Sequence, residues 1–300
     1  MEERVTPGVL SVVAATGQHL IRLDDGMYLK REGVLSRLPD GTSMDALLRR
    51  PLDELQRFLG QDRPAASLQD GAVLEAPIES QEVWAAGVTY QRSLQARADE
   101  AVSSDPYDRV YTAERPEIFF KATAGRVRGP GHAVYIRSDS SWDVPEPELA
   151  VICNSRVEVV GYTIGNDMSS RSIEGENPLY LPQAKVFDGC CALGPAVALA
   201  WDFSPSDRKI ELDIRRNASI IYRSETSTSS MRRSIADLVD YLGRDQRFEA
   251  GCVLLTGTGI VPPPDFTLQD GDEVRIRIDG IGLLENPVRR HASRSESDHP

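Results

Sequence analysis

Two glutamates in the segment WDVPEPELAV, residues 142–151, are the first side chains whose spacing suggests chemistry. Glu146 and Glu148 stand two positions apart, and residues so spaced on an extended strand point to the same face. Pro145 and Pro147 favour that extended backbone. Adjacent carboxylates repel each other unless positive charge lies between them, and a divalent cation would supply it. Because 46 acidic residues in 300 give about seven such pairs by chance, a solvated acidic edge is the alternative.

A third carboxylate, Asp167, ends the run GYTIGND, which predicts a strand that turns into a short helix. With Glu146 and Glu148 it would form an all-oxygen site, which selects Mg²⁺, Mn²⁺ or Ca²⁺ over zinc. Asp167 could instead cap the following helix. Three carboxylates overcharge one divalent ion, so a nearby cation is expected, and Lys185 in QAKVFDG is the candidate.

Lysine is rare in this chain and occurs only at positions 30, 121, 185 and 209. An ammonium can lose its proton and a guanidinium cannot, so a retained lysine can serve acid–base chemistry. Lys121 follows the apolar run 118–120, and it either faces the same site or anchors the GPG loop at 129–131. The glycines of the TGTG run at 256–259 would let the backbone approach a small anion. No GK[ST] follows that run, so no phosphate-binding P-loop is predicted.

Short β segments dominate the elements that would position these residues. Apolar or alternating runs predict strands at 8–15, 19–23, 83–86, 118–120, 134–137, 148–152, 157–164, 197–200, 209–215, 253–256 and 273–279. Helical patterns occur near 43–48, 52–59, 91–102 and 234–243. We therefore predict a β-rich α+β fold and not a doubly wound sheet. Linker-like composition at 60–80 divides the chain into a small N-terminal domain (1–78) and a larger domain (79–286), followed by a disordered tail (287–300).

The composition excludes several classes of partner. Acidic residues outnumber basic ones by 46 to 34, and the net charge of −12 makes nucleic acid or an anionic membrane surface an unexpected partner. No stretch reaches the roughly 18 consecutive apolar residues of a membrane span. Because the N-terminus also lacks the apolar segment of a secretory signal, we expect a cytoplasmic protein. The cysteines at 153, 190, 191 and 252 lack the spacing of a zinc site and are expected to be buried free thiols.

Seven motifs occur in order between about residues 81 and 285: EVWAAGVTY, PEIFFKA, GPG, DVPEPELAVI, VGYTIGNDMSSR, PQAKVFDGCCALGP and LLTGTG. In these words the chain resembles the fumarylacetoacetate hydrolase superfamily. The insertion SRSIEGENPLYLPQAK and the VPEPELAV motif are similar to its 2-keto-3-deoxy-D-arabinonate dehydratase branch. The resemblance implies a mixed β-sandwich roll with a small N-terminal domain, assembled as a homodimer or homotetramer. It also implies Mg²⁺ on Glu146, Glu148 and Asp167, with Lys185 as the active-site lysine.

The same resemblance places Arg171 and Thr258 where the substrate carboxylate would be received. Hydrolases of the superfamily carry N-Y-x-x-H-x-x-E, whose histidine and glutamate activate a water molecule. Here the matching stretch is TYQRS, and Ser93 stands in place of the histidine. Ser93 would face the substrate or simply begin a helix. The histidines, at 19, 132, 291 and 299, all lie outside this motif, which disfavours hydrolysis of a C–C bond.

The implied activity is dehydration of a 2-keto-3-deoxy sugar acid, of the 2-dehydro-3-deoxy-D-arabinonate type, to 2,5-dioxopentanoate. A 2-oxo acid can chelate a divalent cation, which stabilises the enolate formed when the C3 proton leaves. Lys185 would take that proton or hold the enolate oxygen, and the C4 hydroxyl would be eliminated. Glu114 is the candidate acid for the leaving hydroxyl, unless it is an ordinary exposed glutamate. The alternatives are an acylpyruvate- or fumarylacetoacetate-type hydrolase, a 2-oxo acid decarboxylase or tautomerase, and a non-catalytic metal-binding protein.

Overall fold

Two packed β-sheets form the body of the molecule in the computed structural model, which describes residues 9–90, 110 and 112–292. The larger sheet has, in spatial order, β3 (Val34–Arg37), β2 (Gly26–Arg31), β1 (His19–Leu23), β12 (Cys191–Leu199), β10 (Val159–Asp167), β9 (Pro147–Cys153), β15 (Cys252–Leu255), β4 (Glu82–Gly87) and β5 (Glu117–Ala122), with β6 (Val127–Arg128) beside β12. The smaller sheet has β14 (Ser219–Ser227), β13 (Lys209–Arg216), β16 (Glu273–Ile278), β17 (Gly282–Arg290) and β7 (Val134–Ile136). A short ladder joins β8 (Asp143–Val144) to β11 (Ser169–Ser170).

Five α-helices and four 3₁₀ helices lie around the sheets in the described residues. They are α1 (Met44–Leu48), α2 (Leu52–Leu59), α5 (Arg171–Glu176), α6 (Leu181–Lys185) and α7 (Ile235–Gly243), with η1 (Val9–Val12), η2 (Ala124–Arg126), η3 (Pro178–Tyr180) and η4 (Thr228–Ser230). None of them is long and apolar enough to cross a membrane.

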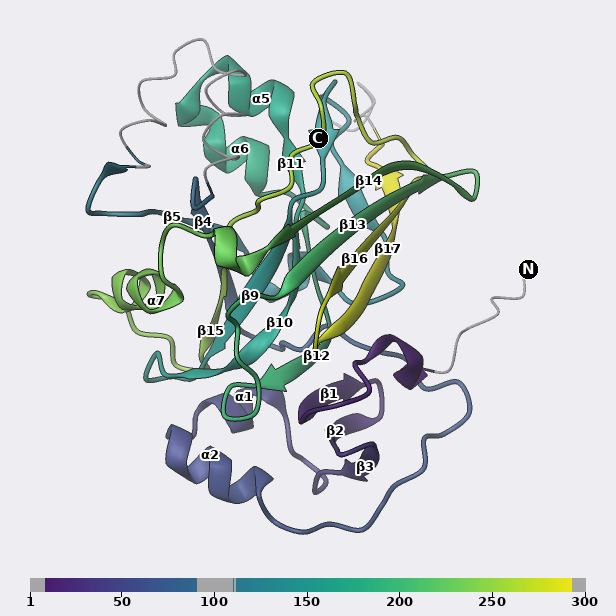
Figure 1. The fold of residues 1–300 in the computed structure, drawn as a ribbon, viewed down its shortest axis with the longest axis vertical. Helices are drawn as coiled ribbons and strands as arrows, with labels where there is room; N and C mark the ends of the chain where they lie inside the picture. Colours follow the sequence, from purple (N-terminus) through teal and green to yellow (C-terminus); the bar gives the residue numbers. More distant parts are fainter. Residues whose placement is uncertain (1–8, 91–109, 111, 293–300) are drawn as a thin grey trace, which may run out of the picture.

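The core lies between the two sheets. Figure 1 shows β13, β14, β16 and β17 lying across β9, β10 and β12. Every residue of β9 and β12 is buried, whereas β13 and β16 alternate buried with partly exposed residues, as their sequences predict. Leu149 and Leu193 of the larger sheet share one apolar cluster with Leu212 and Ile276 of the smaller sheet. The predicted β-rich α+β sandwich is therefore confirmed.

The N-terminal strands extend the larger sheet. Strand β1 pairs antiparallel with β12, with His19 opposite Ala198, so the sheet is continuous across the predicted boundary near residue 78. That boundary stays a prediction. The run 8–15 was expected to be a strand, but residues 9–12 form η1 and only Val13 makes a bridge, to Gly282. An apolar segment forms a strand only where it can pair with the free edge of another strand. Here the packing allows one bridge, between Val13 and Gly282.

Two further segments differ from expectation or fall outside the description. Strand β17 continues to Arg290, into the segment expected to be a disordered tail, because residues 288–290 pair with 134–136 of β7. The helix predicted at 91–102 and the last residues, 293–300, lie outside the described part of the chain. The helix predicted at 234–243 is confirmed as α7, and the Ser234 hydroxyl caps it by accepting the N–H of Asp237 at 3.0 Å.

Candidate metal centre and active site

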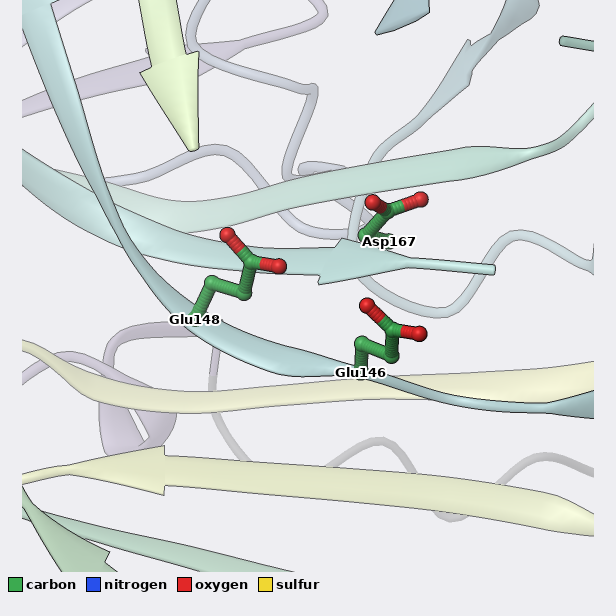
Figure 2. A group of neighbouring side chains, drawn as sticks. All are labelled: Glu146, Glu148 and Asp167. Carbon is green, nitrogen blue, oxygen red and sulfur yellow. The ribbon is translucent and has the colours of Figure 1, made fainter. Parts of the chain in front are cut away.

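Strands β9 and β10 bring the three predicted carboxylates together. The two strands pair antiparallel, with Glu148 opposite Gly165, and the Asp167 N–H donates to the Glu146 carbonyl at 2.9 Å. One carboxylate oxygen of each residue lies within 4.8 Å of the others. Figure 2 shows the three side chains gathered between the two strands. Proline has no N–H group to donate. Because Pro147 is the first residue of β9, no hydrogen bond is lost inside the strand pairing, and the backbone stays extended with both glutamates on one face. The convergence expected from the spacing is therefore present.

Burial makes this cluster strongly unfavourable unless positive charge compensates it. The exposed fractions of Glu146, Glu148 and Asp167 are 4%, 1% and 1%. Burial, with the added repulsion of Asp167 and Glu146, raises the pKa of Glu148 well above its usual value. The Gly257 N–H donates to Glu148 Oε2 at 2.5 Å and stabilises its ionised form in part. An all-oxygen group of like charges suits a hard divalent cation.

Lys185 contacts two of the three carboxylates of the cluster. It is the last residue of α6, and its Nζ lies 2.9 Å from Glu146 Oε2 and 3.0 Å from Asp167 Oδ2. It also donates to Ser169 Oγ at 2.6 Å. These are the contacts of a charged ammonium held against two carboxylates. The charge compensation predicted for Lys185 is therefore present.

Lys121 lies behind the cluster and is fully buried. Its Nζ is 2.5 Å from Asp167 Oδ1, and it donates to the carbonyls of Met168 at 2.8 Å and Lys185 at 2.5 Å. Burial has the largest single effect on the pKa of Lys121 and lowers it, but the Asp167 carboxylate together with Cys190 and Cys191 outweighs burial, and the pKa is raised. Of the two positions predicted for Lys121, its contacts favour the first: its ammonium does not line the cavity, but it pairs with Asp167 of the triad and holds the end of α6.

Lys121→Met is expected to lower the free energy of unfolding in EDTA by about 3 kcal/mol, because it removes the ammonium from Asp167 Oδ1 and from two buried carbonyls and leaves Asp167 with Lys185 alone. Urea unfolding would measure it, with Lys209→Met as the matched control. Lys209 pairs with Glu211 and Glu225 at the surface, where such pairs contribute little. Equal stability of the two variants would show that the Lys121 contacts do not stabilise the fold.

A small cavity opens over this cluster. Its walls come from α5, α6, the ends of β4 and β5 and the loop at 257–258, and its charged lining residues are Glu117, Glu146, Asp167, Arg171, Glu174 and Lys185. Gly87 of β4 pairs with Glu117 of β5, and a Cβ at position 87 would overlap the Glu117 carboxylate. Glycine at 87 therefore gives Glu117 its place in the cavity wall.

The predicted substrate-contacting residues fall in different places. Arg171 and Thr258 both line the cavity, and Arg171 Nη2 lies 3.0 Å from Glu146 Oε1. Glu114 is exposed and does not line the cavity, so its position does not support the predicted acid role. Ser93 lies outside the described residues.

Sequence reasoning missed two carboxylates that line the cavity. Glu117 begins β5, the strand predicted from the apolar run 118–120, and Glu174 follows Arg171 by three positions on α5. Residues three apart on a helix share a face, so the spacing of Glu174 was a usable signal. No such signal separates Glu117 from Glu114. None of the three described histidines, at 19, 132 and 291, lines the cavity, and all four cysteines are buried free thiols as expected.

Comparisons with known proteins show which family this chain belongs to. A family model described as "Fumarylacetoacetate (FAA) hydrolase C-terminal" matches residues 82–289. The chain is 49% identical over 248 residues to a probable 2-keto-3-deoxyxylonate dehydratase of Haloferax volcanii, covering 81% of this chain and 84% of that protein. It is 44% identical over 219 residues to the 2-dehydro-3-deoxy-D-arabinonate dehydratase of Saccharolobus solfataricus, covering 71% of this chain and 74% of the relative.

A solved structure of 2-keto-3-deoxy-D-arabinonate dehydratase complexed with magnesium and 2,5-dioxopentanoate superposes with a TM-score of 0.79. It is 36% identical and covers 92% of this chain and 99% of the other. The resemblance carried by the motifs is thereby confirmed, and the chain belongs to the fumarylacetoacetate hydrolase family.

Proposed function

We propose that this protein is a Mg²⁺-dependent dehydratase of a 2-keto-3-deoxy sugar acid of the pentonate class, releasing water to give 2,5-dioxopentanoate. The observation that carries the proposal is the buried carboxylate triad with Lys185 against it, at the base of a cavity lined by further carboxylates. The dehydratase names of the relatives and the magnesium in the similar solved structure support it.

The residues fit a hard divalent cation. Glu146, Glu148 and Asp167 offer three oxygens within 4.8 Å of one another, all buried and all of like charge. Mg²⁺ held there would stabilise the negative charge that develops on the keto oxygen when the C3 proton leaves the substrate. The groups that would bind the substrate and transfer its proton are side chains of the protein.

The assembly of the protein as a homodimer or homotetramer stays a prediction.

Three residues of the cavity would bind the reacting end of the substrate. Arg171 and Thr258 line the wall next to the triad and would receive the carboxylate of a 2-oxo acid. Lys185, held as an ammonium between Glu146 and Asp167, is a hydrogen-bond donor and suits the keto oxygen as charge grows there. Of the two roles predicted for Lys185, its contacts favour this one over removal of the C3 proton.

Proton transfer is assigned to Glu117. As a carboxylate in the cavity wall it would accept the C3 proton and return it to the C4 oxygen, so that the C4–O bond breaks and water leaves. This elimination leaves an unsaturated 2-oxo acid with a C3=C4 double bond and a C5 hydroxyl. Transfer of a proton from C5 to C3 gives the C4=C5 enol, which tautomerises to the aldehyde of 2,5-dioxopentanoate. One carboxylate thus accounts for the proton in both steps of the elimination, and it takes over the acid role predicted for Glu114.

Glu117→Gln is expected to lower kcat at least about a hundredfold, the usual contribution of general acid–base catalysis. Glu114→Gln is the matched control because Glu114 is exposed, only three residues away and outside the cavity, and its kcat should stay within about twofold of the wild type. Steady-state kinetics at saturating Mg²⁺ measures both. Impairment of the Glu114 variant alone would return the acid role to Glu114.

The proposal is tested by incubating the purified protein with 2-keto-3-deoxy-arabinonate and, separately, with an acylpyruvate, each with Mg²⁺ or with EDTA. Mass spectrometry of the products should show loss of one water from the sugar acid only when Mg²⁺ is present. Cleavage of the acylpyruvate into two acids, with the sugar acid unchanged, would instead assign the protein to C–C hydrolysis.

A further inference from the structure

Strand β5, which carries Glu117, is paired on one side only in the described part of the chain. It is the last strand of the larger sheet there, and β4 is its pairing partner. Glu117 is the first residue of β5, and its pair with Gly87 is the last one between the two strands. Strand ends and unpaired edges are the parts of a sheet that open most easily. The position of Glu117 therefore depends on what holds the residues just before it.

The side chain of Arg233, which lies just before α7, holds those residues. Its guanidinium donates to the carbonyls of Val110 and Glu114, each at 3.1 Å, and to the carbonyl of Ala113 at 2.5 Å. A guanidinium presents several N–H groups in one rigid plane, so a single arginine can fix several carbonyls relative to one another. Glu117 follows Glu114 by three positions, so Arg233 fixes the backbone that enters β5.

The backbone that carries Arg233 is itself anchored beside the metal triad. The Arg232 N–H donates to the Thr89 carbonyl at 3.0 Å. The Thr89 hydroxyl donates in turn to the Thr256 carbonyl at 2.6 Å. Thr256 begins the loop whose next N–H donates to Glu148. Hydrogen bonds and adjacent residues therefore connect the triad to the start of β5 through Arg233.

We propose that Arg233 is a positioning residue that fixes Glu117 at its distance from the metal triad. Arg233 does not line the cavity, so its effect on the reaction would be exerted through β5. An acid–base group must lie within hydrogen-bond reach of the atom it serves, so a small displacement of Glu117 slows proton transfer and leaves the anchor of the substrate in place. This inference rests on the proposed function, because it takes Glu117 as the acid–base group.

Steady-state kinetics of Arg233→Gln at saturating Mg²⁺ tests the proposal. We expect kcat to fall at least about tenfold, because a misplacement of about 1 Å at the reacting atoms can cost about a hundredfold. KM and the affinity for Mg²⁺ should stay within about threefold of the wild type, because the triad lies on other strands. Arg233→Lys keeps the charge and some of the donors, so it should recover part of kcat.

A double-mutant cycle shows whether Arg233 acts through Glu117. In the Glu117→Gln background, Arg233→Gln should change kcat by less than about twofold, because the group that Arg233 positions is already absent. Additive losses in the double variant would show that Arg233 acts elsewhere. Arg247→Gln is the matched control, because Arg247 is exposed and outside the cavity, and its kcat should equal that of the wild type.

Hydrogen exchange followed by mass spectrometry gives a readout that does not depend on activity. In Arg233→Gln, peptides that cover residues 113–122 should exchange faster, whereas those of β9 and β10 should exchange as in the wild type. If Arg233→Gln does not fold, Arg233→Lys takes its place in each measurement.

Unchanged exchange in 113–122, a kcat within about threefold of the wild type, or a loss confined to KM would overturn the inference. These results are distinct from failure of the proposed function, which fails if the wild type releases no water from the sugar acid. In that case the exchange of 113–122 still decides whether Arg233 holds the start of β5.

Discussion

Glu148→Gln is expected to abolish both Mg²⁺ binding and Mg²⁺-dependent dehydration. Glu148 supplies one of three clustered oxygens, and its position is fixed by the pairing of β9 with β10 and by the N–H of Gly257. Stabilisation of the developing charge by a metal contributes several kcal/mol, which corresponds to at least about a thousandfold in kcat. Calorimetry with Mg²⁺ and steady-state kinetics would measure the two losses.

The same variant has a second expected signature, in stability. Because burial and neighbouring carboxylates raise the pKa of Glu148, its ionised form destabilises the metal-free fold at neutral pH. Glutamine removes that charge, so in EDTA the variant should unfold at a temperature at least equal to that of the wild type. Mg²⁺ at a hundred times its dissociation constant should then stabilise the wild type by about 2.7 kcal/mol and leave the variant unchanged.

Glu249→Gln is the control for this experiment, because Glu249 is exposed and its substitution should alter neither Mg²⁺ affinity nor stability. A Glu148 variant that binds Mg²⁺ with wild-type affinity would show that the metal lies elsewhere. A variant that is much less stable than the wild type in EDTA would show that the Gly257 contact outweighs the repulsion within the triad.

Lys185→Met is expected to lower kcat by about a hundredfold to a thousandfold, the usual effect of removing one donor to a developing oxyanion. Methionine keeps much of the length and apolar volume of the side chain and removes the ammonium that reaches Glu146, Asp167 and Ser169. The metal-free variant should also lose stability, because the triad is then less compensated, and Mg²⁺ should restore much of it.

Kinetics at saturating Mg²⁺, with thermal unfolding under the same conditions, separates the two effects. Lys185→Arg keeps the charge but displaces the donor, so its stability should recover more fully than its kcat. If the Lys185→Met variant remains folded with kcat within about tenfold of the wild type, roughly 1.4 kcal/mol of barrier, Lys185 does not act on the reacting atoms.

The chemistry of the metal cluster was visible in the sequence because it depends on local spacing. Glu146 and Glu148 share a face since a strand repeats every two residues, and the flanking prolines make an extended backbone there. The alternation in 209–215 and 273–279 identified two half-buried strands for the same reason. The ordered motifs then linked these segments to one family, whose pattern placed Asp167 and Lys185 beside the pair.

Other features were decided only by the tertiary structure. Whether Glu114 or Glu117 enters the cavity depends on the pairing of β5 with β4, which sets Glu117 opposite Gly87, 30 residues earlier in the sequence. Lys121 lies behind Asp167 and not in the cavity because β5 and the end of α6 meet there. The N-terminal strands join the larger sheet through β1 and β12, which are more than 150 residues apart.

The physical reason is the range of the interactions involved. Periodicity and turn chemistry act between neighbours along the chain and can be read directly from the order of residues. The neighbours of Glu117 and Glu174 in the cavity, and of Lys121 behind Asp167, are set by pairing and packing between distant segments, so no single segment determines them. The sequence alone determined which groups could hold a metal, and the tertiary structure decided which of the other charged groups line the cavity beside them.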